Sequence, residues 1–243
     1  GEKIFRAGFE EGGILVRVAK SHIRVGTFQL ASLSKEKKDI EDLIDYSINR
    51  LQPEIYINQN RYLEFFKKIV ENQIKLIIEW QRVGFIHGVM NTDNMAISGE
   101  TIDYGPCAFM DEYNPNQVFS SIDKNGRYSF INQPRIAFWN LARFAETILH
   151  LIDKNQKLAI KKVEGILKFF EKKYYELWIA MMKNKLNINN KKENDEKLIM
   201  ELLDLMHIFK LDYTNTFVDI ENNKIDRYDF MKNWYSKLKE RTL

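Results

Sequence analysis

Two short polar segments carry the residue types that hold a metal-bound nucleotide. The first is His87–Met95 (HGVMNTDNM), and the second is Ile102–Pro106 (IDYGP). The first segment ends in the adjacent pair Asp93 and Asn94, and the second supplies the carboxylate of Asp103. Mg²⁺ prefers oxygen ligands and takes few of them from the protein when phosphate supplies others. The pattern therefore predicts a magnesium–nucleotide site with Asn94 and Asp103 as metal ligands.

The order of these residues is typical of the catalytic and metal-binding loops of kinases. Kinase loops begin with His-Arg-Asp or His-Gly-Asp and place an Asn five positions after that Asp. His87 and Asn94 keep this spacing, but Val89 stands where the catalytic base of a kinase would be. The segment therefore indicates kinase-type metal ligands with altered acid–base chemistry. A turn rich in Asn and Asp that only satisfies its own backbone is the alternative.

Two arginines, Arg17 and Arg24, lie seven residues apart near the start of the chain. Two guanidiniums that reach one cavity would suit phosphate oxygens. From the pattern alone, however, one solvent-facing arginine and one ion-paired arginine is the simpler interpretation.

Other polar residues are interpreted as supports for the loop. We expect His87 to brace the loop backbone rather than to act as an acid or base. The helix predicted to begin at Pro134 carries Arg135, Trp139 and Asn140. These three are expected to brace the active loop rather than to contact a substrate.

The elements that position these residues are predicted from periodicity and turn signals. The β-branched run Gly13–Ala19 predicts a strand, and a short hairpin is expected from Met95 to Ile102 with its turn at Ser98 and Gly99. Loops are expected over residues 106–133 and 184–194. Helical spacing, with Ser34 as a cap and Gly84 as an end, predicts helices over about residues 35–51, 60–83, 134–153, 155–183, 194–209 and 224–240.

These elements lack the strand–helix alternation of a doubly wound sheet. They predict an α+β fold that is mostly helical, similar to the C-terminal lobe of a protein-kinase-like fold with a small β-hairpin at the active site. One domain is expected over residues 1–243. In it, residues 1–30 form an edge strand and hinge, 31–153 a core with both loops, and 154–243 a helical extension.

Composition restricts the function classes. The chain has 243 residues, 44% of them hydrophobic, and a net charge of +3. This charge is too small to indicate a nucleic-acid partner. Cys107 is the only cysteine, so neither an internal disulfide nor a multi-cysteine zinc site is expected. Without a membrane-spanning run or a signal-peptide pattern, a cytoplasmic protein is expected.

Four motifs in the first 140 residues together resemble the selenoprotein O family, a pseudokinase-fold family. They run in the family's order and are RVAKSHIRVGTFQ at Arg17–Gln29, HGVMNTDNM at His87–Met95, TIDYGP at Thr101–Pro106 and NQPRIAFWN at Asn132–Asn140. The helical remainder of the chain carries no signature of its own.

This resemblance implies protein adenylylation, in which AMP moves from ATP to a Ser, Thr or Tyr hydroxyl of a protein. ATP is flipped in that family, so Arg17 and Arg24 would hold the displaced γ-phosphate. Asp93 would be the general base. Asn94 and Asp103 would bind Mg²⁺ or Mn²⁺, and Asp103 would also lie at the nucleotide. The resemblance thus reverses the simpler interpretation of the two arginines.

The sequence also departs from the family. The Gly-rich segment, the ATP-contacting lysine and its glutamate partner precede the Arg17 segment in family members, and they are absent here, as is a Cys-containing tail. The N-lobe is therefore expected to be missing, and the chain alone to bind Mg-ATP weakly and transfer AMP slowly or not at all. A partner segment or chain would supply the missing part. The alternatives are a non-catalytic binding module and a small-molecule phosphotransferase of the aminoglycoside type, against which Val89 argues.

Overall fold

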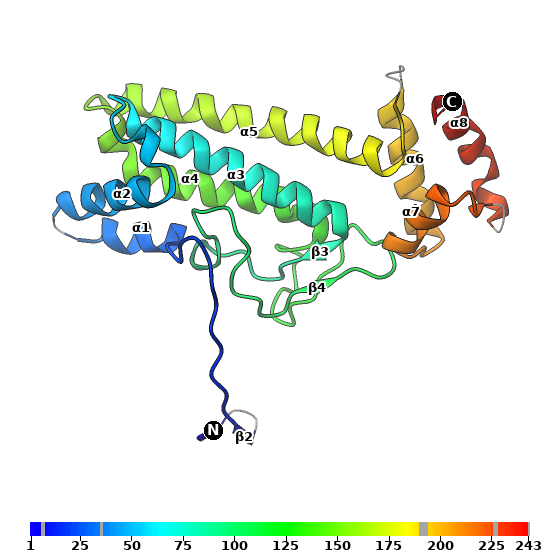
Figure 1. The fold of residues 1–243 in the computed structure, drawn as a ribbon, viewed down its shortest axis with the longest axis horizontal. Coiled ribbons are helices and arrows are strands. Elements are labelled where there is room, and N and C mark those ends of the chain that lie inside the picture. Colours follow the sequence, from blue (N-terminus) through cyan, green and yellow to red (C-terminus); the bar gives the residue numbers. More distant parts are fainter. Residues whose placement is uncertain (6–7, 35, 190–193, 226–227, 243) are drawn as a thin grey trace.

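A computed structural model describes residues 1–5, 8–34, 36–189, 194–225 and 228–242. The longest helices are α3 (Arg61–Val83), α4 (Gln133–Ile152) and α5 (Gln156–Lys185), which pack against one another along the long axis of the molecule (Figure 1). Apolar residues recur every three or four positions on the inner faces of α3 and α4. The largest side chains among them that are fully or almost fully buried are Phe65, Phe66, Ile69, Ile74, Ile77, Leu141 and Phe144.

Two shorter helices, α1 (Val25–Ser32) and α2 (Lys38–Leu51), cover one end of the long helices. Phe28 of α1 is fully buried, and its ring meets that of Phe144 edge-on at 4.7 Å. Such aromatic pairs contribute about 1 kcal/mol beyond their buried area. This contact therefore fixes α1 against α4.

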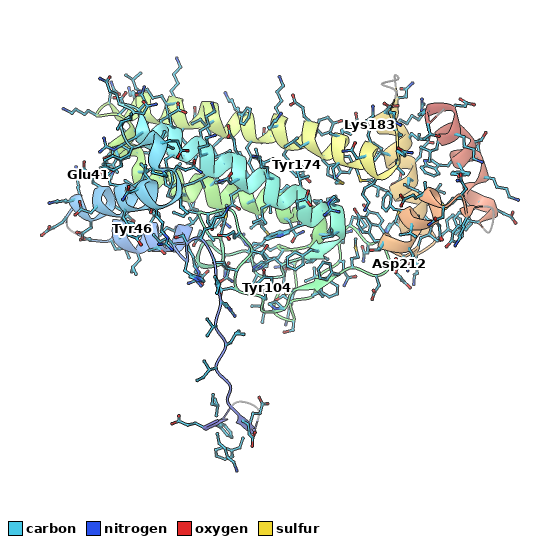
Figure 2. The ribbon with its side chains drawn as sticks, in the orientation of Figure 1. Glu41, Tyr46, Tyr104, Tyr174, Lys183 and Asp212 are labelled. Atoms are coloured by element: carbon cyan, nitrogen blue, oxygen red, sulfur yellow. The ribbon has the colours of Figure 1, made fainter. Side chains whose placement is uncertain are left out.

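At the other end lie α6 (Asp195–Ile208), α7 (Tyr213–Glu221) and α8 (Lys232–Thr242). Lys183, near the end of α5, forms a partly buried ion pair of 2.7 Å with Asp195 of α6 (Figure 2). The indole of Trp234 in α8 donates to the Leu198 carbonyl at 2.8 Å. These contacts join α5, α6 and α8.

The β structure consists of two short antiparallel pairs. β1 (Lys3–Phe5) pairs with β2 (Phe9–Glu11) in an exposed hairpin, and β3 (Phe85–Ile86) pairs with β4 (Ala108–Phe109) beside the long helices. Single 3-10 turns are η1 (Pro53–Ile55), η2 (Thr92–Asn94), η3 (Phe130–Asn132) and η5 (Asp229–Met231). The N-terminal segment extends away from the helices (Figure 1).

The predicted α+β class with mostly helical content is confirmed. The predicted α3, α4, α5 and α6 appear within a few residues of their expected bounds, and Gly84 ends α3 in the left-handed conformation with a φ of 70°. The kinase-like lobe and the single domain with its three parts stay predictions. Of the expected loop over residues 184–194, residues 190–193 lie outside the described residues.

Several predicted elements are wrong. The segment Gly13–Ala19 is extended but forms no strand, because no described segment pairs with it. Ser34 is not a helix cap, since α2 begins only at Lys38, and the last helix begins at Lys232 rather than near residue 224. Helices α1 and α7 were not predicted.

The predicted hairpin from Met95 to Ile102 is also wrong. Its turn exists, with Gly99 at a φ of 77° donating to the Ala96 carbonyl at 3.2 Å. Its two arms do not pair, however, because Ala96 forms its bridge with Arg24 instead.

Among the described residues, no helix is long and apolar enough to cross a membrane.

Candidate functional site

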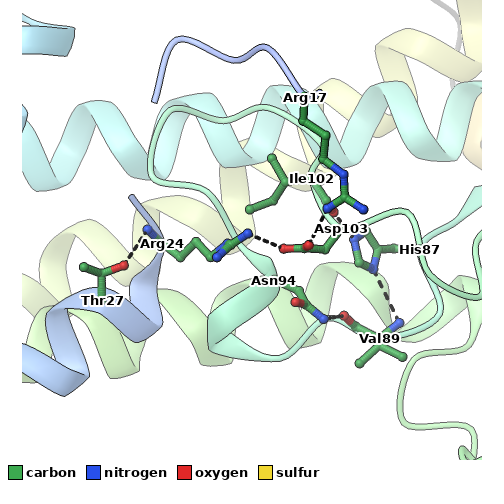
Figure 3. Close-up of polar contacts among 8 residues, drawn as sticks. All are labelled: Arg17, Arg24, Thr27, His87, Val89, Asn94, Ile102 and Asp103. Carbon is green, nitrogen blue, oxygen red and sulfur yellow. Dashed lines mark hydrogen bonds and ion pairs between the residues drawn. The ribbon is translucent and has the colours of Figure 1, made fainter. Parts of the chain in front are cut away.

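Asp103 is the centre of the candidate site. One carboxylate oxygen lies 2.6 Å from the guanidinium of Arg17, and the other lies 2.7 Å from that of Arg24 (Figure 3). The Asp103 side chain is 27% exposed, and the two arginines are 42% and 34% exposed. The structure thus brings together three of the predicted site residues. The simpler interpretation expected one solvent-facing arginine and one ion-paired arginine, whereas both arginines form ion pairs with Asp103.

The backbone around Arg24 explains this convergence. Arg24 precedes α1 and forms an antiparallel bridge with Ala96, and the Val25 N–H donates to the Met95 carbonyl at 3.0 Å. Because the bridge holds Arg24 next to the loop, its side chain can reach Asp103. Arg17 reaches the same carboxylate from the extended segment before α1.

Asp103 has an unusual backbone conformation that aims its side chain. Its φ is 57°, in the left-handed region, where Asp and Asn are among the few non-glycine residues that occur with any frequency. Its carbonyl accepts from the Gly105 N–H at 2.7 Å. The preceding carbonyl, that of Ile102, accepts from His87. The chain is therefore fixed on both sides of Asp103.

Asp93 and Asn94 lie in the 3-10 turn η2 of the loop that follows β3. The Asn94 side-chain amide donates to the Val89 carbonyl at 2.9 Å (Figure 3). Since this bond uses the nitrogen, the oxygen of the amide is left to accept or to bind a cation. Asp93 is exposed. The shared metal site of Asn94 and Asp103, and the role of Asp93 as a base, stay predictions.

The first turn of α1 approaches Asp93 closely. A Cβ added to Gly26 would lie 3.1 Å from the Asp93 Cα and 3.2 Å from its nitrogen. Only glycine therefore fits at this contact without a shift of the loop. The small residue that the sequence places at position 26 sets the distance between α1 and η2.

His87 is almost fully buried and braces two backbone segments. Its Nε2 lies 2.7 Å from the Ile102 carbonyl, and its backbone N–H donates to the side chain of Gln133 at 3.0 Å. Burial lowers the pKa of His87 despite the Ile102 hydrogen bond and the Asp103 charge, so the neutral imidazole is favoured. These contacts agree with the predicted bracing role.

Side chains of helix α4 donate hydrogen bonds to backbone carbonyls of β3 and of the loop that follows it. Asn140, predicted as a brace, donates to the Met90 carbonyl at 2.9 Å. Gln133, which sequence reasoning missed, also donates to the Phe85 carbonyl at 2.9 Å, and its side chain is fully buried. Two signals for it were present in the sequence: its position directly before Pro134 at the start of a helix, and its place in the motif Asn132–Asn140.

The other two predicted braces do not hold the loop in this way. Arg135 is exposed. The Trp139 ring is 39% exposed and has the guanidiniums of Arg127 and Arg143 within 5.0 and 5.4 Å of its centroid. The structure therefore places these residues on the surface of α4 rather than against the loop backbone.

The residue types at the site fit a metal-bound nucleotide. Among the described residues, no group of three or more His, Cys, Asp or Glu side chains is arranged to hold a metal ion. A divalent cation here would take few protein ligands, as Mg²⁺ does when phosphates supply the others. Arg17 and Arg24 carry two positive charges and Asp103 carries one negative charge, so the cluster has a net positive charge. A net positive charge favours the binding of phosphate oxygens.

Comparison with known proteins extends this picture. The sequence model of the family described as "Protein adenylyltransferase SelO" matches residues 1–241. A protein nucleotidyltransferase YdiU of Clostridium perfringens is 49% identical over 241 residues, which are 97% of this chain and 49% of that protein. Its counterpart in Brevibacillus brevis is 54% identical over 217 residues, 89% of this chain and 44% of that protein.

A third relative, the protein nucleotidyltransferase YdiU of Pelagibacter ubique, is 49% identical over 233 residues, 96% of this chain and 48% of that protein. The chain spans about half the length of the curated relatives that it matches. A family match over nearly the whole chain, together with these identities, shows that the chain belongs to the SelO family of protein adenylyltransferases.

Proposed function

We propose that this chain contributes the metal-binding and phosphate-binding side of a protein adenylyltransferase that uses ATP and a divalent cation, Mg²⁺ or Mn²⁺. The observation that carries the proposal is the convergence of Arg17 and Arg24 on Asp103. Exposed ion pairs stabilise a fold by only about 0–1 kcal/mol each, so fold stability alone gives little reason for two arginines to share one partly exposed carboxylate. Membership of the SelO family supports the same proposal.

Each predicted site residue has a role in this reaction. Arg17 and Arg24 would bind the terminal phosphate of ATP, and Asn94 and Asp103 would hold the cation against the phosphates. The cation would neutralise charge on the phosphate oxygens as pyrophosphate leaves. A bound, oriented nucleotide accounts for much of the rate in such transfers, because positioning and charge neutralisation dominate them.

The acceptor is proposed to be a Ser, Thr or Tyr hydroxyl of a protein. Its oxygen would attack the α-phosphorus, the bond from that phosphorus to the bridging oxygen would break, and the hydroxyl proton would pass to Asp93. The exposed position of Asp93 supports access by a protein acceptor. A cytoplasmic location suits this substrate and stays a proposal.

A further segment or chain is proposed to complete the site. The extended stretch around Arg17 exposes the apolar side chains of Ile14, Val16 and Val18, which are 98%, 78% and 94% exposed. An additional strand that paired with this stretch would cover them and would place new groups over the nucleotide. This proposal agrees with the upstream Gly-rich segment and lysine that family resemblance implies.

Labelled ATP tests the proposal. The chain is incubated with an acceptor protein and ATP labelled on either the α- or the γ-phosphate, alone and with the segments that its relatives contain in addition. We expect α-label on protein, slowly or not at all for the chain alone and faster for the completed protein. Transfer of γ-label would indicate a kinase, and no transfer by the completed protein would indicate a binding module. Either result would contradict the proposal.

A further inference from the structure

A cavity lies at the opposite end of the molecule from α1 and α2. Its volume is about 660 Å³, and it is lined by the ends of α3 and α5 together with α7 and α8. This is the end at which Figure 2 shows Lys183 on α5. None of the residues that line it belongs to the Asp103 site. A cavity of this size accommodates a small organic molecule.

Lys185, the last residue of α5, lines this cavity and is half-buried, with its amine next to two aromatic rings. Its Nζ lies 4.1 Å from the ring centroid of Tyr213 and 3.7 Å from that of Phe217. It also donates to the carbonyl of Arg82 at 2.7 Å, at the end of α3. The amine is thus held in one place, between two aromatic rings and a backbone carbonyl.

The surroundings of Lys185 favour its neutral form more than those of a surface lysine do. Burial, and then the nearby charge of Arg82, lower the pKa of Lys185 to about 7. Contact with the two rings and the carbonyl favours the ammonium form, whereas burial and the charge of Arg82 favour the neutral amine. Near neutral pH, a substantial fraction of the amine therefore carries a free electron pair and is a nucleophile.

The other charged groups that line the cavity are mainly cations. Arg82 on α3 and Lys239 on α8 face it together with Glu221 on α7. Arg82 is also paired with Glu79 at 2.7 Å, outside the cavity, whereas the Lys239 amine lies 4.8 Å from the centroid of a tyrosine ring. The apolar side chains of the lining are Val83, Leu186, Phe217, Val218, Ile220 and Leu238.

We propose that this cavity binds a small carbonyl compound that carries an anionic group, and that Lys185 forms an imine with it. The anionic group would lie near Lys239, and the apolar body would contact the walls of the cavity. The Nζ of Lys185 attacks the carbonyl carbon, a C–N double bond forms, and the carbonyl oxygen leaves as water with the two amine protons. The step needs no oxidant or reductant, and hydrolysis reverses it.

Trapping of the imine tests the proposal. The intact chain is incubated at pH 7 with pyridoxal 5′-phosphate as a probe, reduced with borohydride and mapped by mass spectrometry. We expect Lys185 to be labelled at least about tenfold faster than Lys172, an exposed lysine of the same helix. The rate at Lys185 should have its midpoint near pH 7, as the pKa of its amine requires. Equal rates at the two lysines, or a midpoint near pH 10, would overturn the proposal.

Two variants separate the parts of the site. Lys185→Arg should abolish the fast label, and Lys172→Arg, its matched control, should leave it unchanged. Lys239→Gln should slow labelling by pyridoxal 5′-phosphate several-fold but not labelling by pyridoxal, which lacks the phosphate. If Lys239→Gln slows both probes equally or neither, the assignment of the anionic group to Lys239 is wrong. Since the wild-type rates are decisive alone, the test holds even if Lys185→Arg does not fold.

Discussion

Asp103 combines a conformational cost with an electrostatic role. Its left-handed backbone is a conformation that costs a non-glycine residue about 1 kcal/mol, and both of its carboxylate oxygens are engaged by arginines. The sequence predicted that Asp103, Arg17 and Arg24 belong to one site through family resemblance. Residue patterns alone did not, because Arg17 and Asp103 are 86 positions apart and no local rule joins them.

The two arginines should distinguish nucleotides by their phosphate number. If Arg17 and Arg24 bind the terminal phosphate, Arg24→Ala should weaken ATP binding about tenfold or more and leave AMP binding unchanged, because charge-assisted hydrogen bonds to phosphate contribute about 1.5–3 kcal/mol. Titration calorimetry of the completed protein with each nucleotide measures this. Lys172→Ala, on the exposed face of α5, is the control. Equal losses for ATP and AMP would argue against contact with the terminal phosphate.

His87 should make the fold sensitive to acid. Its pKa is lowered in the folded state by burial, so the unfolded chain binds the proton more readily. The stability contributed by neutral His87 is therefore present above about pH 6.5, the ordinary pKa of histidine, and is lost as the pH falls below it. Denaturant unfolding between pH 8 and pH 5 measures this loss.

His87→Gln should flatten that pH dependence. His150 lies mainly at the surface, and partial burial together with the charge of Lys37 lowers its pKa as well. His150→Gln is therefore the matched control and should remove less of the slope. An unchanged slope in His87→Gln would show that the His87 imidazole is not the group responsible.

At the scale of elements, the sequence predicted helices with a strong apolar periodicity, but it did not predict which segments pair as β structure. The apolar faces of α3, α4, α5 and α6 identified them in the sequence. α1 was missed because its eight residues include Gly26 and Thr27 and form only a weak apolar face. The expected strand over Gly13–Ala19 and the expected hairpin failed for one reason, since β structure depends on a partner that the local sequence does not specify.

The contact between α1 and η2 should be sensitive to one methyl group. Gly26→Ala would place a Cβ 3.1 Å from the Asp93 Cα and should shift the loop by a few tenths of an ångström. We expect AMP transfer to fall about tenfold, because a misplaced catalytic group loses much of its effect. Steady-state assays of α-label transfer by the completed protein measure this.

Gly165→Ala is the matched control for that substitution. Gly165 lies in α5, and an added Cβ would have nothing within 4 Å. It should leave transfer unchanged and stabilise the fold by about 0.5–1 kcal/mol, because alanine favours a helix interior. Full transfer by Gly26→Ala would show that α1 does not set the position of Asp93.

Gln133 should be the most important brace of the loop. Gln133→Leu leaves the His87 N–H and the Phe85 carbonyl buried without this partner, each at a cost of about 1–3 kcal/mol. Urea unfolding should therefore show a large loss of stability. Glu146→Gln, on the exposed face of α4, should change stability by at most about 0.5 kcal/mol. Similar losses of stability in Gln133→Leu and Glu146→Gln would show that Gln133 does not brace the loop.

At the scale of the whole molecule, packed helices support one polar surface formed by segments distant in sequence. The loop from β3 to η2 packs against α3 and α4, and α1, which also packs against α4, lies beside this loop (Figure 1). The Arg17 segment reaches Asp103 from the extended stretch before α1 (Figure 3). The chain spans about half the length of its relatives. Under the proposed function, AMP transfer should be faster when the additional segments of these relatives are present.

The most direct test of the account is α-label transfer by the completed protein with Asp103→Asn. Asparagine tolerates the left-handed backbone, so the substitution removes a charge with little strain. The loss of two partly exposed ion pairs should cost at most about 2 kcal/mol of stability. Transfer should nevertheless fall at least about 100-fold, because a charged group that positions the metal and phosphates is gone. Transfer within about twofold of wild type, in a folded variant, would contradict the assignment of this site.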